Sequence, residues 1–467
     1  EPSAFDPATC YVAATSYKSG DFTPYLYKTT DYGKTWTTIT SGIAPEHFTR
    51  VVREDPKHKG LLYAGTENGM YLSFDDGASW KAFQLNLPVV PITDLHIKDN
   101  SLIVATQGRS LWMVDDLTVL HQAASANAAQ PVLYTPKDAY RTKGRGGKAT
   151  ATAGANLPNG VITHFYLPEA PTKDSRVALH FIQQGDTLVT LATDAKDKKD
   201  KLDVKKGLNT YVWDTRGVDA KRLEGMILWS ANLSGPKAVP GNYTVALEAG
   251  GYIRNADFKI LPDPRAEATV ADMQAQYDFI SGINATINKA HEAIETIRSV
   301  NAKLAEFQKT YKDDAAQKSL VASAKALADK LSTVEKALYQ TQNRSGQDPL
   351  NFPIRLTNKL GHLNSMAGMD DFAPTAQDLM VRDELTAYGY ALEIDDRSRS
   401  GQTVQKAFLK DRSLGSLLTL DYRPRTGPMR KLRIKLEIDT NPPVGATYAM
   451  PVLDYPFPSA VRVFDLP

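Results

Sequence analysis

Two copies of one turn motif constrain this chain more than any other feature of its sequence. They read TTDYGKTW at residues 29–36 and SFDDGASW at residues 73–80, and both fit the pattern S/T-x-D-x-G-x-T/S-W. In such a turn the aspartate accepts hydrogen bonds from backbone N–H groups, glycine supplies a conformation closed to other residues, and tryptophan covers the apolar seam beneath the hairpin. The pattern therefore predicts structural roles for Asp31, Gly33, Trp36, Asp75, Gly77 and Trp80.

The spacing of the two motifs predicts repeated β-sheet units. Their aspartates lie 44 positions apart, an interval that suits one four-stranded blade of a β-propeller. Strand-like runs at residues 10–14, 61–65 and 102–106 surround the motifs, and residues 108–116 keep the blade spacing without the motif. The pattern resembles the Asp-box (BNR) propellers of sialidases, sortilin-type domains and related repeat proteins. A propeller closes with about 4–8 blades, so we expect preceding blades to be missing and the chain to be a fragment at both ends.

The Asp-box resemblance leaves two functions open. Sialidases of this kind use an arginine triad, an acidic general acid and a tyrosine nucleophile with a glutamate, whereas the boxes themselves perform no hydrolysis. The expected blades contain only Arg50, Arg53 and Arg109, with no recognisable Tyr–Glu arrangement beside them. Arg109 lies in a loop and is a candidate ligand contact, with a solvated arginine as the alternative. The resemblance implies either a binding or scaffold protein for a glycan or protein ligand, or a sialidase-like glycosyl hydrolase with its catalytic residues on missing blades.

The next region, residues 131–262, predicts a β-sandwich. About seven short strands over about 130 residues fit that architecture, and the runs GLNTYVWD and PGNYTV resemble the immunoglobulin-like modules appended to secreted bacterial proteins. His164 and His180 lie on expected strands without a third ligand nearby, so we expect packing roles and no metal site. The expected strands are residues 161–167, 177–182, 188–191, 209–214 and 240–247.

Residues 265–377 predict a helical hairpin. Two apolar stripes follow the three–four spacing of packed helices, the turn between them is expected at residues 311–314, and a third element at residues 353–363. His291 is expected to be exposed. The order of a propeller, a sandwich and a helical arm resembles the layout of a family of large exported bacterial proteins. This resemblance implies a periplasmic or extracellular location for residues 1–377. The stripe positions are Ile280, Ile283, Ile287, Ala290, Ile294, Ile297 and Leu304, then Leu320, Ala324, Leu327, Leu331, Val334 and Leu338.

The composition changes near residue 378. Residues 1–377 hold 29 Lys and 13 Arg, whereas residues 378–467 hold 4 Lys and 9 Arg. Strands are expected at residues 388–394, 404–410 and 431–439. The runs KLRIKLEIDTNPP and LDYPFPSAVRVFDLP resemble the AbiEii abortive-infection nucleotidyltransferase toxins, whose fold is like that of polymerase β and whose parent protein would be cytoplasmic.

The AbiEii resemblance implies a third function. Glu437, then Asp439, is the best candidate for the strand carboxylate that helps to hold two Mg²⁺ ions in such enzymes. The upstream Gly-Gly-Ser/Thr loop and Asp-x-Asp pair do not occur, so we expect no cofactor as the chain stands and no transferase activity. Nucleotide transfer to RNA or protein by the purified chain, assayed with labelled nucleotides, would overturn this prediction.

Together these features predict a multidomain, β-rich chain with a partial Asp-box propeller, an immunoglobulin-like sandwich, a helical hairpin and a truncated α+β nucleotidyltransferase-like tail. We interpret the change near residues 378–388 as a join of two reading frames. A net charge of +2 offers no broad basic surface for nucleic acid. The sequence contains no run of about 18 apolar residues, the length that a membrane-spanning helix needs. A single cysteine, Cys10, excludes a disulfide framework. The expected domains are residues 1–122, 131–262, 265–377 and 385–467.

Overall fold

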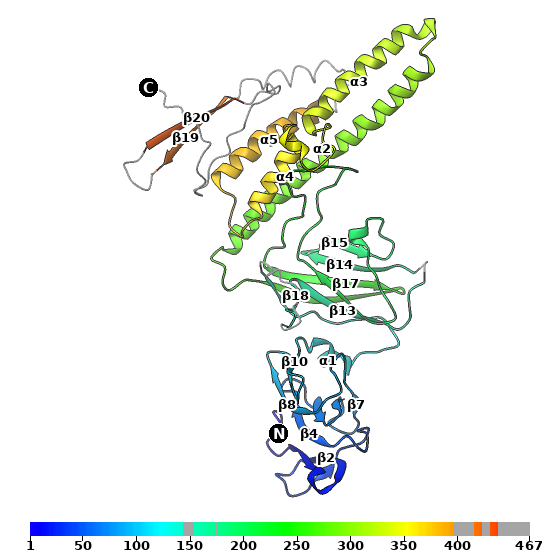
Figure 1. Cartoon of the computed structure of the whole chain (residues 1–467), viewed down its shortest axis with the longest axis vertical. Helices are drawn as coiled ribbons and strands as arrows, with labels where there is room; N and C mark the ends of the chain where they lie inside the picture. The colour runs from blue at the N-terminus through cyan, green and yellow to red at the C-terminus, as the bar shows by residue number, and fades with distance from the viewer. Residues whose placement is uncertain (143–153, 173–174, 396–414, 423–429, 438–467) are drawn as a thin grey trace. The chain divides into compact units, whose positions relative to one another are not determined.

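The computed structural model divides the chain into two compact units. The first comprises residues 1–218 and 236–270, and the second comprises residues 219–235 and 271–467. The first unit is built of β-strands and the second mainly of helices, as Figure 1 shows. The structure describes residues 1–142, 154–172, 175–395, 415–422 and 430–437.

Three antiparallel sheets form the N-terminal region. Each sheet joins strands that follow one another in sequence, as the repeat interval predicts, and the strands expected at residues 10–14, 61–65 and 102–106 are confirmed. A short helix, α1 (Thr118–Ala123), follows the third sheet. The sheets are β1 (Cys10–Ser16), β2 (Asp21–Thr29) and β3 (Thr37–Thr38); β4 (Thr49–Glu54), β5 (Leu62–Thr66), β6 (Gly69–Ser73) and β7 (Lys81–Ala82); and β8 (Ile92–Lys98), β9 (Ser101–Thr106) and β10 (Leu111–Val114).

The middle sheet is buried on both faces. Successive residues of a strand point to opposite faces, and in β4 Val51 joins one apolar cluster while Val52 joins the other. In β5 the same division separates Tyr63 from Leu62. The cluster that contains Val52 includes residues of the first sheet, such as Leu26. The cluster that contains Val51 includes residues of the third sheet, such as Leu102. The three sheets therefore stack face to face around two cores.

Two further sheets share a single core in residues 131–262. One has the strand order β11-β13-β16 and the other β12-β18-β17-β14-β15. Phe165 and Trp213 of the first sheet pack with Phe181 and Val245 of the second, so this is a two-layer arrangement. All five expected strands are confirmed. The strands are β11 (Val132–Leu133), β12 (Ala139–Arg141), β13 (Val161–Leu167), β14 (Val177–Gln183), β15 (Asp186–Ala192), β16 (Gly207–Trp213), β17 (Gly241–Ala249) and β18 (Tyr252–Pro262).

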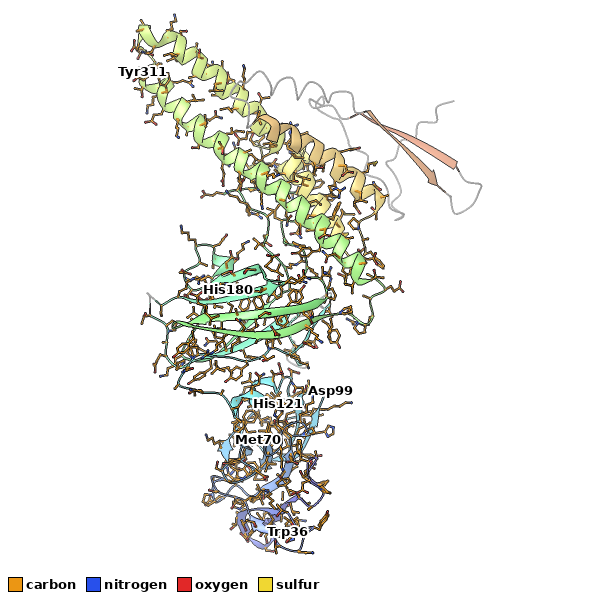
Figure 2. The ribbon with its side chains drawn as sticks, turned by 180° about the vertical axis from the view of Figure 1, so that it is seen from behind. Trp36, Met70, Asp99, His121, His180 and Tyr311 are labelled. Atoms are coloured by element: carbon orange, nitrogen blue, oxygen red, sulfur yellow. The ribbon has the colours of Figure 1, made fainter. Side chains whose placement is uncertain are left out.

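Four helices account for most of the second unit: α2 (Val270–Thr310), α3 (Lys318–Leu338), α4 (Leu356–Ala367) and α5 (Ala376–Asp395). The expected turn at residues 311–314 is confirmed, and Tyr311 marks that end of the hairpin in Figure 2. The stripe of α2 is buried from Ile280 to Ile297. The stripe of α3 is only partly buried, since Leu320 is 57% exposed and Leu327 is 46% exposed. The stripe of α3 is exposed there because the core of the unit gathers at the other end of the hairpin.

That core is completed by the connection between β16 and β17. Leu223, Met226 and Leu233 of this connection pack among the isoleucines of α2 and the leucines of α4. The amide nitrogens of Asn284 and Asn364 both donate to the carbonyl of Ser234, at 3.0 and 3.1 Å. Buried polar groups need such partners. The amides therefore fix the connection, residues 219–235, against the helices.

His291 lies under the same connection. It is fully buried, so the prediction of an exposed position is wrong. Its Nδ1 is 2.5 Å from the carbonyl oxygen of Lys221, and its Nε2 is buried without a partner in the described structure. The carbonyl can only accept, so Nδ1 carries the proton in the neutral ring. Burial lowers the pKa of His291, and the Lys221 carbonyl opposes part of that effect.

The tail departs from expectation at its first predicted strand. Residues 388–394 lie within helix α5, which begins at a capping box: Asp378 N donates to Thr375 Oγ1 at 3.1 Å, and Thr375 N donates to Asp378 Oδ2 at 2.9 Å. Val381 and Leu385 pack against the helical core, so α5 is continuous through the change in composition. The strand expected at residues 431–439 is observed as β20 (Arg430–Glu437), paired with β19 (Gly415–Tyr422). Residues 404–410 lie outside the described residues.

We predict that His291 makes the helical unit less stable in mild acid. Its pKa is lowered from about 6.5, so the unfolded chain takes up the proton first. The stability that the neutral, buried His291 contributes is fully present above the unfolded pKa of about 6.5. It is lost as pH falls through that pKa towards the lower pKa of the folded state. Urea unfolding followed by helical circular dichroism, at about pH 8 and about pH 5, should show a smaller pH dependence in His291→Gln. Gln keeps a donor for the Lys221 carbonyl but does not titrate, and an unchanged pH dependence would contradict the assignment.

Candidate functional site

The two Asp boxes fold as the sequence predicts around their carboxylates. Thr35 N donates to Asp31 Oδ1 at 2.9 Å, and Ser79 N donates to Asp75 Oδ1 at 2.8 Å. Each aspartate also accepts the hydroxyl proton of the same Thr or Ser, and these bonds hold the pKa of both carboxyls below its usual value. Gly77 has a φ of 87°, and a Cβ there would lie 2.7 Å from Ile39 Cδ1. These groups hold the turns.

The two box tryptophans differ. Trp80 is 3% exposed, and its Nε1 donates at 2.7 Å to the carbonyl of Ile39, which directly follows strand β3 of the first sheet. Trp36 is 46% exposed, and its Nε1 donates to Gly33 O at 3.1 Å within its own turn. Figure 2 labels Trp36 at the edge of the described sheets. Trp80 is thus buried in an apolar seam, whereas about half of the Trp36 side chain is exposed.

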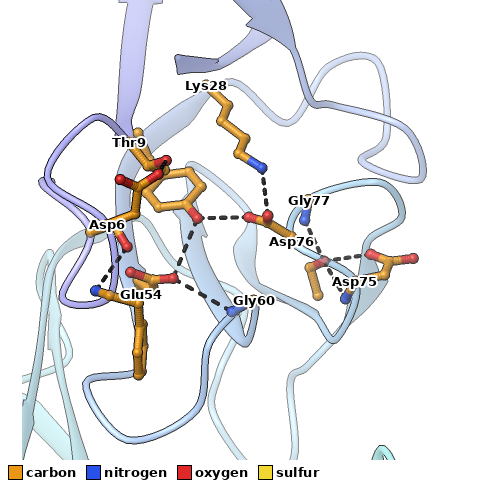
Figure 3. Close-up of polar contacts among 12 residues, drawn as sticks. Asp6, Thr9, Lys28, Glu54, Gly60, Asp75, Asp76 and Gly77 are labelled. Atoms are coloured by element: carbon orange, nitrogen blue, oxygen red, sulfur yellow. Dashed lines mark hydrogen bonds and ion pairs between the residues drawn. The ribbon is translucent and has the colours of Figure 1, made fainter. Parts of the chain in front are cut away.

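A buried polar cluster lies beside the second box (Figure 3). The Tyr11 hydroxyl donates to Asp76 Oδ1 at 2.6 Å and lies 3.4 Å from Glu54 Oε1, and Lys28 forms an ion pair with Asp76. Tyr11 is 1% exposed. Burial and the Asp76 carboxylate raise the pKa of Tyr11, so the phenol keeps its proton at neutral pH. No local pattern in the sequence marks this Tyr–Glu pair, because Tyr11 and Glu54 lie 43 positions apart. Asp76 likewise occupies a variable position of the box.

Glu54 connects this cluster to two more segments. Its Oε2 accepts from Ala4 N at 3.1 Å, and its Oε1 accepts from Gly60 N at 3.4 Å. The cluster therefore joins the N-terminal segment, the first sheet and the second box. A protonated phenol enclosed by two carboxylates cannot act as a nucleophile without losing these contacts, since the phenolate would be repelled by both. The geometry is that of a structural tie.

The three arginines of the N-terminal sheets are each engaged separately. Arg50 pairs with Glu67 at 2.5 Å. Arg53 pairs with Asp94 at 2.6 Å and donates to the carbonyl of Leu95 at 2.9 Å. The exposed Arg109 donates to Gly108 O at 3.2 Å, and its own carbonyl accepts from Trp112 Nε1 at 2.7 Å. They form no triad, and the role of Arg109 as a ligand contact stays a prediction.

A second polar cluster joins α1 to the turn between β4 and β5. His121 Nε2 is 2.8 Å from Asp55 Oδ2, and the Tyr63 hydroxyl donates to the same oxygen at 3.2 Å. Asp55 is fully buried, and the His58 ring stacks on the His121 ring with centroids 4.0 Å apart. Burial and the neighbouring His121 lower the pKa of His58. A buried carboxylate needs such donors, so the cluster fastens α1, with His121 labelled in Figure 2, to the middle sheet.

The described residues contain no group of three or more His, Cys, Asp or Glu side chains that could hold a metal ion. His164 Nδ1 is 2.9 Å from the Thr210 hydroxyl, and His180 Nδ1 is 2.9 Å from the Thr190 hydroxyl. The two histidines lie in different sheets, β13 and β14. Among the described helices, none is both long and apolar enough to cross a membrane.

The tail residues predicted from the nucleotidyltransferase resemblance are only partly described. Glu437 is the last residue of β20, where it pairs with Gly415 of β19. Asp439 lies outside the described residues, as does the run at residues 453–467. A carboxylate pair at this position stays a prediction.

The unequal burial of the box tryptophans predicts unequal costs of removing them. Trp80→Ala should lower the free energy of unfolding of the first unit by about 3–5 kcal/mol, because it empties a buried site. Trp36→Ala should lower it by less than about 1 kcal/mol, because much of that ring is already in water. Urea denaturation of both variants measures the difference. Equal losses would contradict the assigned burial.

Comparisons with known proteins found similarity over only parts of the chain. No protein-family model matches it, and no curated protein matches. An ancestral GH74 enzyme is similar at 20% identity over 23% of this chain and 13% of that one, with a TM-score of 0.19. YCF48 bound to D1 peptide is similar at 20% identity over 20% of this chain and 31% of that one, with a TM-score of 0.16. The extracellular domain of a two-component system from B. thetaiotaomicron is similar at 11% identity over 52% of this chain and 29% of that one, with a TM-score of 0.18. The chain spans less than a third of each of these structures.

Proposed function

We propose that this chain is a non-catalytic binding or scaffold protein of the exported Asp-box propeller type, with an immunoglobulin-like sandwich and a helical arm as further modules. The observation that carries the proposal is the use made of the carboxylates in the N-terminal sheets. Asp31 and Asp75 hold turns, Asp76 and Glu54 enclose Tyr11, and Asp55 holds His121. Each of these groups is engaged in joining segments of the fold.

Stacked sheets with short connecting loops support a role in presenting surfaces. Loops held by a rigid scaffold are the usual place for binding residues. Aromatic side chains are prominent at such contacts, and the first box exposes two of them, Tyr32 at 74% and Trp36 at 46%. We infer a protein or glycan as the ligand of this surface, in agreement with an exported location for residues 1–377.

The sialidase-like alternative would require a reactive Tyr–Glu pair and an arginine triad. Tyr11 and Glu54 are the pair that the fold brings together, but the phenol is buried and its pKa is raised. Arg50 and Arg53 pair with carboxylates elsewhere. Within the described residues, nothing favours the nucleotidyltransferase alternative either.

A hydrolysis assay with a matched variant separates the proposal from the sialidase alternative. We expect the purified chain to release no fluorophore from a 4-methylumbelliferyl sialoside above the buffer rate. Glycan and protein arrays should reveal saturable binding by the same preparation. Hydrolysis that increases with protein concentration and disappears in Tyr11→Phe would overturn the proposal, because Phe removes only the hydroxyl. Tyr25→Phe, which alters a half-buried Tyr–Asp pair of strand β2 instead, is the control.

A further inference from the structure

The helical unit contains a cavity of about 350 Å³ that none of the functions above uses. It is half-open to solvent and is bordered by α2, α3, the turn after α3 and residues 223–226 of the connection between β16 and β17. Small-molecule sites have volumes of about 300–1,000 Å³, so this one has room for a ligand of monosaccharide size. Its lining is mainly polar.

Charge on the lining is unbalanced. Arg298, Lys336 and Arg344 contribute three positive charges, against two negative charges from Glu224 and Glu335, which leaves a net charge of +1. Arg298 uses its Nε on Glu335, at 2.8 Å. Arg344 donates from Nη1 only to backbone carbonyls, at 3.2 and 3.4 Å, and Lys336 makes no ion pair with a described residue. Lys336 and Arg344 are solvent-exposed, and Arg344 also interacts electrostatically with Asp348. They offer two cations that make no direct ion pair with a described carboxylate, which suits a monoanion.

The lining also contains hydrogen-bonding groups that an anion alone would leave unpartnered. Asn343 borders the cavity, but its Oδ1 is buried away from solvent and lies out of reach of a ligand there. The Tyr339 hydroxyl accepts from Ile227 N at 3.0 Å and keeps its own proton to donate. The Glu224 carboxylate makes no hydrogen bond with a described residue, and Glu335 keeps further acceptor capacity beside Arg298.

We propose that this cavity binds a small organic monoanion that also carries hydroxyl groups, such as a sugar acid or hydroxy acid. Lys336 and Arg344 bind its carboxylate. Its hydroxyls donate to the carboxylates of the lining and accept from Tyr339. Because residues 223–226 form one wall, binding also stabilises the connection against the helices.

Calorimetric titration of the full chain tests this with three probes. D-Glucuronate carries both features, propionate carries the charge alone, and D-glucose carries the hydroxyls alone. We expect glucuronate to bind at least about tenfold more tightly than either comparison compound, since each removes a set of contacts. Lys336→Gln and Arg344→Gln should each weaken glucuronate binding by about tenfold. Lys330→Gln, at an exposed position of α3 outside the cavity, should leave it unchanged.

Three results would overturn the proposal. They are the absence of glucuronate binding by the unaltered chain, equal affinities for the three probes, and an equal loss in Lys330→Gln and Lys336→Gln, which would indicate a general effect of surface charge. Helical circular dichroism shows that a variant is folded. Because the cavity belongs to the helical unit, these results are independent of the hydrolysis assay on the N-terminal sheets.

Discussion

Buried carboxylates that must find donors are the constraint on which the N-terminal fold depends. An ionised carboxylate is costly to bury unless it is paired, and each one here finds its donors on a different segment. The buried Glu54 accepts from Ala4 of the N-terminal segment, and the buried Asp55 accepts from His121 of α1. The half-buried Asp76 accepts from Tyr11 and Lys28 of the first sheet. The apolar clusters bring the sheets together, and these polar ties select one register between them. The same ties occupy the groups that an enzyme would need to keep available.

Local patterns predicted much of this fold, because they depend on spacing within one segment. The box motif predicted the carboxylate bonds of Asp31 and Asp75, and alternation predicted the strands of residues 131–262. Strand β18 was missed although Gly250 and Gly251 precede it at φ values of 57° and 79°, the pattern of a tight hairpin turn. In the tail, the aromatic run at residues 388–394 favoured a strand, but the Thr375–Asp378 cap starts a helix that continues through it.

What the sequence could not predict depends on partners far along the chain. His291 lies beside the apolar stripe of α2, four residues after Ile287 and three before Ile294. Its hydrogen-bond partner, the Lys221 carbonyl, belongs to a connection 70 positions earlier, which no local pattern marks. Trp36 and Trp80 occupy identical motif positions, but their burial differs, because Trp80 donates to Ile39, which lies 41 positions away, whereas Trp36 donates within its own turn. The cavity likewise combines residues 223–226 with α2 and α3. No local pattern marks such a combination.

The central claim is that the Tyr11 cluster is a structural tie. A double-mutant cycle of Tyr11→Phe and Asp76→Asn, measured by urea unfolding of the first unit, tests it most directly. A tie predicts that the two changes are coupled by about 1–3 kcal/mol, because the second change costs little once the first has broken the hydrogen bond. Additive losses, with no coupling between the two positions, would contradict the account.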